Sequence, residues 1–209
     1  MSLIDSLKWR YATKKYDNTK KVSTENIEKI KDAIQLSASS FGLQLYKVLI
    51  IENQSIKQSL RSASWNQPQV EDASHLLVFC SYATVTDTNI DDYVKLKSEI
   101  QGIELSEISG YGNFIKGGLK NLTENQKQTW MAKQTYIALA NALAICGELK
   151  IDATPMEGFL PDQYNEILGL AEKGLTASVV MAIGYRSEED NTQNDLKVRK
   201  SKDDLFEVI

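Results

Sequence analysis

The sequence is poor in the residues that build metal sites and disulfide frameworks. Its 209 residues include one histidine, His75, and two cysteines, Cys80 and Cys146, each inside an apolar run. A single histidine without a CxxC or HExxH spacing excludes the common zinc sites, so we expect no bound metal. We expect both cysteines to be buried free thiols rather than a disulfide pair.

Long apolar runs and an excess of basic residues are also missing. No stretch approaches the roughly 18 apolar residues that span a membrane, and 24 basic against 28 acidic residues leave a net charge of −4. An acidic chain is a poor candidate for nucleic-acid binding, which needs a basic face. Residues 1–10 lack the basic and apolar regions of a signal peptide. We therefore expect a cytoplasmic protein without nucleic-acid or membrane partners.

The chain has only three prolines, so long stretches are free to form helices. A chain of this length buries about 70% of its unfolded surface, and we expect a single domain over residues 1–209. Apolar periodicity and capping residues predict helices at 2–9, 90–100, 124–149 and 161–168. A further amphipathic helix is predicted after Ser23, where Ile27, Ile30 and Ile34 recur at helical spacing. Apolar runs predict strands at 48–51, 76–80 and 175–183.

Glycines are concentrated between residues 102 and 118, and they predict mobile or irregular backbone near 110–118. Helices and strands are mixed without a regular βαβ alternation, which favours an α+β fold. No GxGxxG, GxxxxGK[ST] or GxSxG motif is present, so the dinucleotide fingerprint, the P-loop and the hydrolase elbow are all excluded.

Two pairs of cations lie near opposite ends of the chain. Arg10 and Lys14 are four residues apart, and on a helix they would share a face and could grip one phosphate. Lys197 and Arg199 are two residues apart, and on an extended segment their side chains would point the same way. Taken alone, each pair is typical of a solvated basic surface.

Three loop segments carry polar or conformationally special residues. The segment Thr154–Gly158 combines proline with glycine, so a flat ligand could rest on it, but taken alone we expect a plain turn. The segments 37–40 and 65–69 could hydrogen-bond a heteroaromatic ring, but as isolated loops they indicate nothing more.

In their order and spacing, these segments resemble the nitroreductase family, the FMN-dependent NAD(P)H oxidoreductases. The resemblance covers essentially the whole chain. It rests on six short motifs, which are Arg10–Asp17, Leu36–Ser40 with Gln44, Asp72–His75, Trp130–Gln134, Pro155–Phe159 and Lys197–Arg199. It implies an α+β fold with a central, mostly antiparallel sheet flanked by helices, and an intertwined homodimer with two FMN sites at the interface.

The resemblance also implies roles for individual residues. The FMN phosphate would be bound by Arg10, Lys14, Lys197 and Arg199, with a backbone contact from Ala12. Pro155, Met156, Glu157 and Gly158 would lie along the isoalloxazine ring, with the Glu157 amide near N5. The ring or ribityl chain would be hydrogen-bonded by Asn66, Gln69 and Gln134, while Ser39 and Ser40 would come from the other subunit. Phe41, Tyr111 and Phe114 would wall the substrate pocket.

The chain departs from the family pattern at several positions. Many members have proline at Ala38, asparagine at Gly42 and Pro-Trp at Leu45-Tyr46, which affects the expected contacts with the other subunit. Some members have lysine at Gln69. A neutral amide compensates the anion of reduced flavin less well than lysine, so we expect a lower reduction potential.

The implied activity is a ping-pong hydride transfer from NADH or NADPH to a small aromatic acceptor, a nitroaromatic or a quinone, without a catalytic acid or base. Both reductants stay open, because no basic cluster is assignable to a 2′-phosphate. One alternative is a flavoenzyme of the same fold with another reaction, such as ene reduction, dehalogenation or flavin breakdown. Another is a non-catalytic flavin-binding protein.

Overall fold

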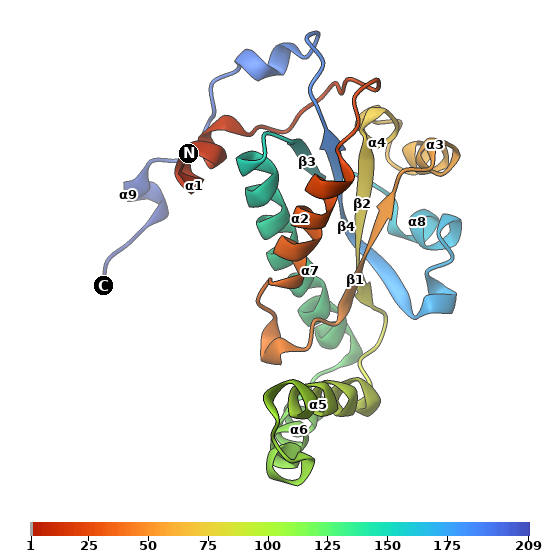
Figure 1. Ribbon diagram of the computed structural model, residues 1–209, viewed down its shortest axis with the longest axis vertical. Helices are drawn as coiled ribbons and strands as arrows, with labels where there is room; N and C mark the ends of the chain where they lie inside the picture. Colours follow the sequence, from red (N-terminus) through yellow and green to blue (C-terminus); the bar gives the residue numbers. More distant parts are fainter. Residues whose placement is uncertain (1) are drawn as a thin grey trace.

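A four-stranded antiparallel sheet organises the chain in the computed structural model, which describes residues 2–209 (Figure 1). The strand order is β1-β2-β4-β3, with the strands at Tyr46–Ile51 (β1), His75–Tyr82 (β2), Asp152–Met156 (β3) and Leu175–Gly184 (β4). The central strand β2 is buried from His75 to Ser81, which explains its continuous apolar run. The expected α+β architecture is confirmed.

Helices cover both faces of this sheet (Figure 1). The α-helices are Leu3–Trp9 (α1), Thr24–Gln35 (α2), Gln54–Ser62 (α3), Gln69–Asp72 (α4), Asp87–Gln101 (α5), Leu105–Lys120 (α6), Glu124–Glu148 (α7), Pro161–Ile167 (α8) and Lys202–Leu205 (α9). Short 3₁₀ turns lie at Ser40–Gly42 (η1), Ala171–Lys173 (η2) and Asn191–Asn194 (η3). Helices α2 and α7 form one core with the sheet, and α3 and α8 form a second core on its other face.

Capping residues begin the helices where the sequence predicts. Ser2 and Thr123 each form a reciprocal capping box, and Ser23 accepts a hydrogen bond from the Asn26 amide at 3.3 Å. Both cysteines are buried free thiols, as expected. Burial raises the pKa of each thiol to about 12, so both stay protonated at neutral pH.

The expectation of irregular backbone near residues 110–118 is wrong, because these residues lie inside the 16-residue helix α6. Each glycine weakens a helix by about 1 kcal/mol, but tertiary packing outweighs that cost here. Ile115 and Leu119 are buried in a third apolar core, shared between α5, α6 and the start of α7. Gly112 lies where α5 comes close, since a Cβ at this position would be 3.1 Å from a methyl carbon of Val94.

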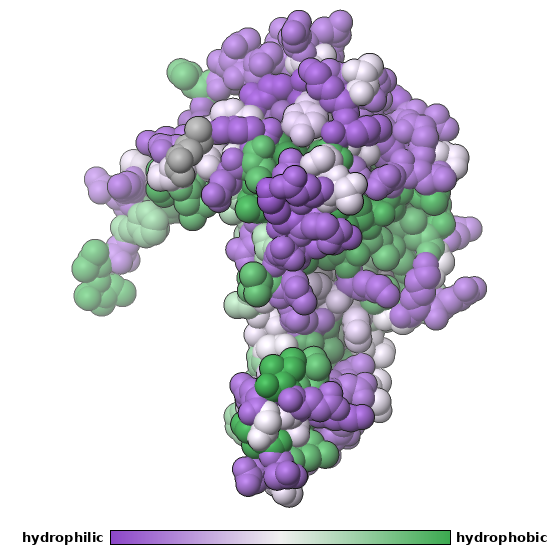
Figure 2. Space-filling model, viewed as in Figure 1, coloured by the Kyte–Doolittle hydropathy of each residue, from purple (hydrophilic) through white to green (hydrophobic). Residues whose placement is uncertain are grey.

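Apolar side chains also lie on the outside of the chain. On α7, the stretch Tyr136–Ile145 is apolar nearly all round, which predicts burial on most sides in a core or a subunit interface. Within one chain, Tyr136 and Ile137 are about two-fifths exposed. The C-terminal tail passes α1 and projects away from the sheet, and its apolar end is solvent-exposed (Figures 1 and 2). No helix within residues 2–209 is long and apolar enough to cross a membrane.

The close approach of Gly184 to its neighbours predicts that alanine at this position changes the stability of the protein differently from alanine at Gly117. A Cβ on Gly184 would lie 2.9 Å from the Tyr16 ring and 3.0 Å from the Ser74 backbone nitrogen. Gly184→Ala should therefore lower the free energy of unfolding by about 1–3 kcal/mol. The matched change Gly117→Ala, in α6 with no atom within 4 Å of the new Cβ, should raise it by about 0.5–1 kcal/mol. Urea unfolding of both variants tests this, and equal shifts would contradict it.

Candidate functional site

The two cation pairs from opposite ends of the chain line one cleft of about 600 Å³. It is bordered by the segment that follows α1, by strand β3 and by the C-terminal tail. The expected phosphate residues Arg10, Ala12, Lys14, Lys197 and Arg199 all line it, together with Pro155 of β3. The structure thus brings together residues that the sequence separates by almost 190 positions.

Arg10 and Lys14 do not lie on one face of a helix, the arrangement that their spacing suggested. Helix α1 ends at Trp9, and Arg10 has an extended backbone with φ −68° and ψ 145°. Lys14 lies well beyond the helix, in a segment without regular secondary structure. The two cations meet Lys197 and Arg199 because the tail crosses this segment, where the Lys197 ammonium donates to the carbonyl oxygens of Leu7 and Arg10.

The cations of this cleft lack acidic partners. Within residues 2–209, none of Arg10, Lys14, Lys197 and Arg199 forms an ion pair. Burial and the nearby Arg199 lower the pKa of Arg10, and burial together with Arg10 and Arg199 lowers the pKa of Lys197. The Arg10 Nε is buried without a hydrogen-bond partner. A bound anion accepts a hydrogen bond from such an unpaired donor and reduces the repulsion among the like charges, so this environment favours anion binding.

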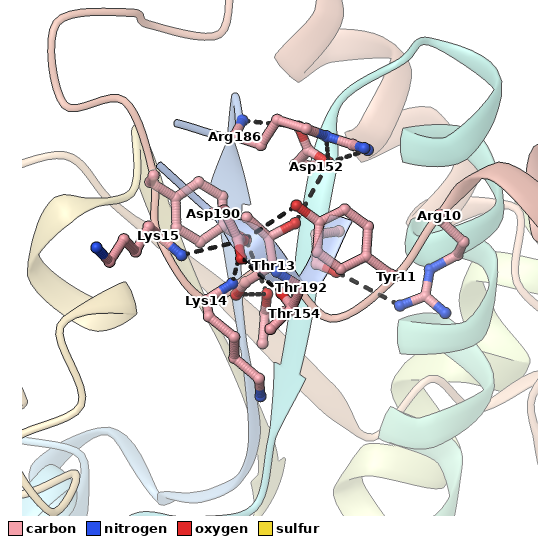
Figure 3. A network of polar contacts seen from close by, with 12 residues as sticks. Arg10, Tyr11, Thr13, Lys14, Lys15, Asp152, Thr154, Arg186, Asp190 and Thr192 are labelled. Atoms are coloured by element: carbon pink, nitrogen blue, oxygen red, sulfur yellow. Dashed lines mark hydrogen bonds and ion pairs between the residues drawn. The ribbon is translucent and has the colours of Figure 1, made fainter. Parts of the chain in front are cut away.

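A partly buried ion pair fixes the flank of this cleft (Figure 3). The Arg186 guanidinium bonds the carboxylate of Asp152, at the start of β3, with a shortest N–O distance of 2.6 Å. The same guanidinium lies 4.5 Å from the ring centres of both Trp9 and Tyr11. The Thr13 hydroxyl also donates to Asp152, at 3.3 Å. The residues on either side of Arg10 are therefore held against the edge of the sheet.

A second group of expected residues gathers where β3 ends. The expectation that 154–158 is a plain turn is wrong, because Thr154, Pro155 and Met156 pair with β4. Proline fits there because β3 is an edge strand. The Gln67 amide donates to the Gly158 carbonyl at 2.7 Å. A Cβ on Gly158 would lie 2.9 Å from both Gln67 and the Trp65 ring, so glycine is required for this approach.

The segment from Trp65 to the first residue of α4 packs against Gly158 and contains two of the three polar residues expected to face the flavin. Asn66 has a positive φ of 57°, next to Trp65 at 53°, a conformation that is uncommon outside glycine. Gln69 is 6% exposed, and its Oε1 is buried without a hydrogen-bond partner. A buried amide oxygen of this kind is costly unless a ligand satisfies it.

The remaining expected residues form a third group at the start of α7. The Ser40 amide donates to Gln134 Oε1 at 2.8 Å, and Ser39 Oγ accepts from the Gln44 amide at 3.0 Å. Phe41 meets Phe114 edge-to-face at 6.3 Å between ring centres. The Tyr111 hydroxyl points to the Phe41 carbonyl oxygen at 3.5 Å.

This third group does not meet the cation cleft within one chain. Gln134 lies near the middle of α7, whereas Gly147, near its end, packs against the Ser6 backbone of α1. A rise of 1.5 Å per residue separates Gln134 from Gly147 by about 20 Å. Figure 1 shows the same separation, with α1 and the α5–α6 pair at opposite ends of α7.

Two further residues at the site were not identified from the sequence. The Tyr136 hydroxyl donates to the Glu157 carboxylate at 2.6 Å, although the sequence places Tyr136 within an apolar run. Burial and this carboxylate raise the pKa of Tyr136 to about 12, so it stays a donor at neutral pH. Asp190 accepts several hydrogen bonds beside the cleft, although it follows two glutamates in a charged stretch that gave no signal.

Comparison with known proteins gives a consistent result. Residues 7–185 match the sequence profile of the nitroreductase family. The major NAD(P)H-flavin oxidoreductase of Aliivibrio fischeri is 34% identical over 217 residues, covering 99% of this chain and 98% of that protein.

Solved structures share the fold over the whole chain. A protein of Exiguobacterium sibiricum, solved in complex with FMN, has a TM-score of 0.84 at 20% identity and covers 100% of this chain and 98% of its own. CLA-ER, an enone reductase of gut-bacterial fatty acid saturation metabolism, has a TM-score of 0.83 at 16% identity with the same coverage. At these identities the likeness establishes the fold.

Proposed function

Because the chain belongs to the nitroreductase family, we propose that it is an NAD(P)H-dependent oxidoreductase that binds FMN and reduces nitroaromatics or quinones. The FMN phosphate occupies the cation cleft, and the flavin ring lies toward Glu157 and Gly158. The name of the Aliivibrio relative and the FMN of the Exiguobacterium structure support this assignment.

The observation that carries the proposal is the group of four cations without acidic partners. A phosphate dianion satisfies the buried Arg10 Nε and relieves the repulsion among Arg10, Lys197 and Arg199. Solvated surface charge would not need a partly buried arginine with an orphaned donor. The lining of the cleft therefore fits the phosphate end of FMN.

The second group fits the ring end. The orphaned Gln69 Oε1 offers a hydrogen-bond acceptor, and Gly158 itself adds no side chain next to the Trp65 ring and Gln67, which pack where its Cβ would be. The Tyr136–Glu157 hydrogen bond keeps the Glu157 side chain directed to α7, so that its amide is available to a ligand. Bound flavin supplies the hydride chemistry, and these residues bind and orient it.

The site needs a second copy of the chain. We assign Ser39 and Ser40 to the flavin of the other subunit. We now assign Gln134 to that flavin as well, in place of the flavin of its own chain, because it accepts from the Ser40 amide and lies about 20 Å along α7 from Gly147, which packs against α1. Phe41, Tyr111 and Phe114 then wall the acceptor pocket of that subunit. The exposed apolar positions of α7 and of the tail supply surface for such an interface.

Removing two of the cations should affect FMN and riboflavin differently. In Lys197→Ala/Arg199→Ala, two charge-assisted hydrogen bonds to phosphate are lost, each worth about 1.5–3 kcal/mol. FMN binding should weaken by about 3 kcal/mol or more, at least two orders of magnitude in Kd. Riboflavin lacks the phosphate, so its affinity should change little. Flavin-fluorescence titrations measure both, and unchanged FMN affinity would remove the tail from the site.

We expect NAD(P)H and the acceptor to bind one after the other in the same opening above the flavin. NADH or NADPH should bleach the bound flavin under anaerobic conditions, which a non-catalytic binding protein would not show. Double-reciprocal plots against a nitroaromatic or quinone acceptor should be parallel, and intersecting plots would rule out the shared opening. Enones belong in the same acceptor screen, because CLA-ER performs that reaction on this fold.

A flavin site that uses residues of both subunits predicts an obligate two-fold dimer. We expect an interface above about 2,000 Å², the range of permanent homodimers. Light scattering at micromolar concentration should give about twice the chain mass of 23.5 kDa. A monomer mass with flavin still bound would contradict the shared site.

A further inference from the structure

Asp190 lies against the segment Tyr11–Lys15, which carries the cation Lys14 (Figure 3). One oxygen, Oδ2, accepts from the Tyr11 hydroxyl at 3.0 Å, the Lys14 amide at 2.8 Å and the Lys15 amide at 3.2 Å. The other, Oδ1, accepts from the Thr192 amide at 3.1 Å and the Thr192 hydroxyl at 2.5 Å. One carboxylate therefore joins the N-terminal segment to the turn from which the tail leaves.

All of these donors are neutral. The Asp190 side chain belongs to a residue only 1% exposed, and within residues 2–209 it forms no ion pair. Burial opposes its ionisation, but hydrogen bonds from Thr192, Lys14, Lys15 and Tyr11 outweigh burial and lower the pKa of Asp190. Burial and this carboxylate raise the pKa of Tyr11 to about 12, so the tyrosine remains a donor.

The charge of Asp190 has the wrong sign to attract a phosphate. A buried anion beside the cleft weakens the field of the cations, so Coulomb's law alone makes Asp190 unfavourable for FMN. Its geometry has the opposite consequence, because it fixes the backbone from which the Lys14 side chain extends and the start of the turn leading to Lys197 and Arg199. In Figure 3 the Lys14 side chain points away from the carboxylate that holds its amide.

We infer that Asp190 is a positioning residue that pre-organises the phosphate cleft by joining the Tyr11–Lys15 segment to the Thr192 turn. This inference rests on the proposed function. The role of Asp190 is to place cations that it does not pair with. Cations held in position before the ligand arrives lose less side-chain and backbone entropy on binding.

The direction in which Asp190→Asn changes FMN affinity separates a positioning role from a purely electrostatic one. In Asp190→Asn the negative charge is lost, and an amide has only one acceptor oxygen for the two sets of donors. Positioning predicts at least a tenfold weaker FMN affinity, with riboflavin affinity within twofold of the unsubstituted protein. Charge alone predicts tighter FMN binding. Fluorescence titration of both flavins measures the split, at a temperature where circular dichroism shows the variant folded.

The matched control is Asp195→Asn, which removes the same charge from a residue that lines the same cleft. No hydrogen bond to the Asp195 carboxylate is recorded within residues 2–209. FMN affinity should therefore stay or rise in this variant. If Asp190→Asn does not fold, Tyr11→Phe/Thr192→Val removes one hydroxyl donor on each side and keeps the charge, and it should show the same split at smaller size.

Three outcomes would overturn the inference. They are unchanged or tighter FMN binding in Asp190→Asn, an equal loss for FMN and riboflavin, or a loss of the same size in Asp195→Asn. A preference for FMN over riboflavin that is as large in Asp190→Asn as in the unsubstituted protein overturns this inference alone. If the unsubstituted protein shows no such preference, the phosphate assignment fails, and the role of Asp190 fails with it.

Discussion

Mutual repulsion of unpaired cations is the constraint on which the arrangement of the site depends. Within residues 2–209, Arg10, Lys14, Lys197 and Arg199 line one cleft without acidic partners, and burial together with their mutual repulsion lowers the pKa values of Arg10 and Lys197. Attraction among the cations cannot hold their segments together, so other contacts must. These contacts are the hydrogen bonds from the Lys197 ammonium to the Leu7 and Arg10 carbonyl oxygens, the partly buried pair Arg186–Asp152 with the Trp9 and Tyr11 rings against its guanidinium, and the carboxylate of Asp190.

The sheet determines how the two halves of a flavin site are spaced. Strand β3 runs from Asp152 to Met156, a length of about 13 Å at about 3.3 Å per residue. Its residue Pro155 lines the cation cleft, and the Glu157–Gly158 backbone follows directly after the strand. Pairing with β4 fixes that length and direction, because Asp152 opposes Gly184 and Met156 opposes Val180. Gly184 is required at this junction, where Tyr16 and Ser74 leave no room for a side chain.

Much of this fold could be predicted from local sequence signals. Apolar runs located β1, β2 and β4, and capping residues located α1, α2 and α7, because each signal acts within a few residues. Helix α6 was missed because its stability comes from burying Ile115 and Leu119 against α5, a contact that glycine content does not reveal. Strand β3 was read as a loop because an edge position tolerates Pro155.

The candidate site was predictable only in part, and for a different reason. Its cations and its Pro155–Gly158 segment are short motifs whose resemblance to a family survives in sequence. Tyr136 and Asp190 act through hydrogen bonds between distant segments, and Asp190 reaches residues more than 170 positions away. No periodicity or spacing records such a bond, so only the folded chain identifies these partners.

The choice of partner at Asp190 follows from the same constraint on charge. A cation that paired with a nearby carboxylate would be neutralised and lost to an anionic ligand. Backbone amides and the hydroxyls of Tyr11 and Thr192 hold the Asp190 carboxylate instead, and they leave every cation of the cleft unpaired. Asp152 does form an ion pair, but its partner is Arg186, which lies outside the cleft lining. Both carboxylates thus fix the backbone around the cleft without neutralising the four cations in it.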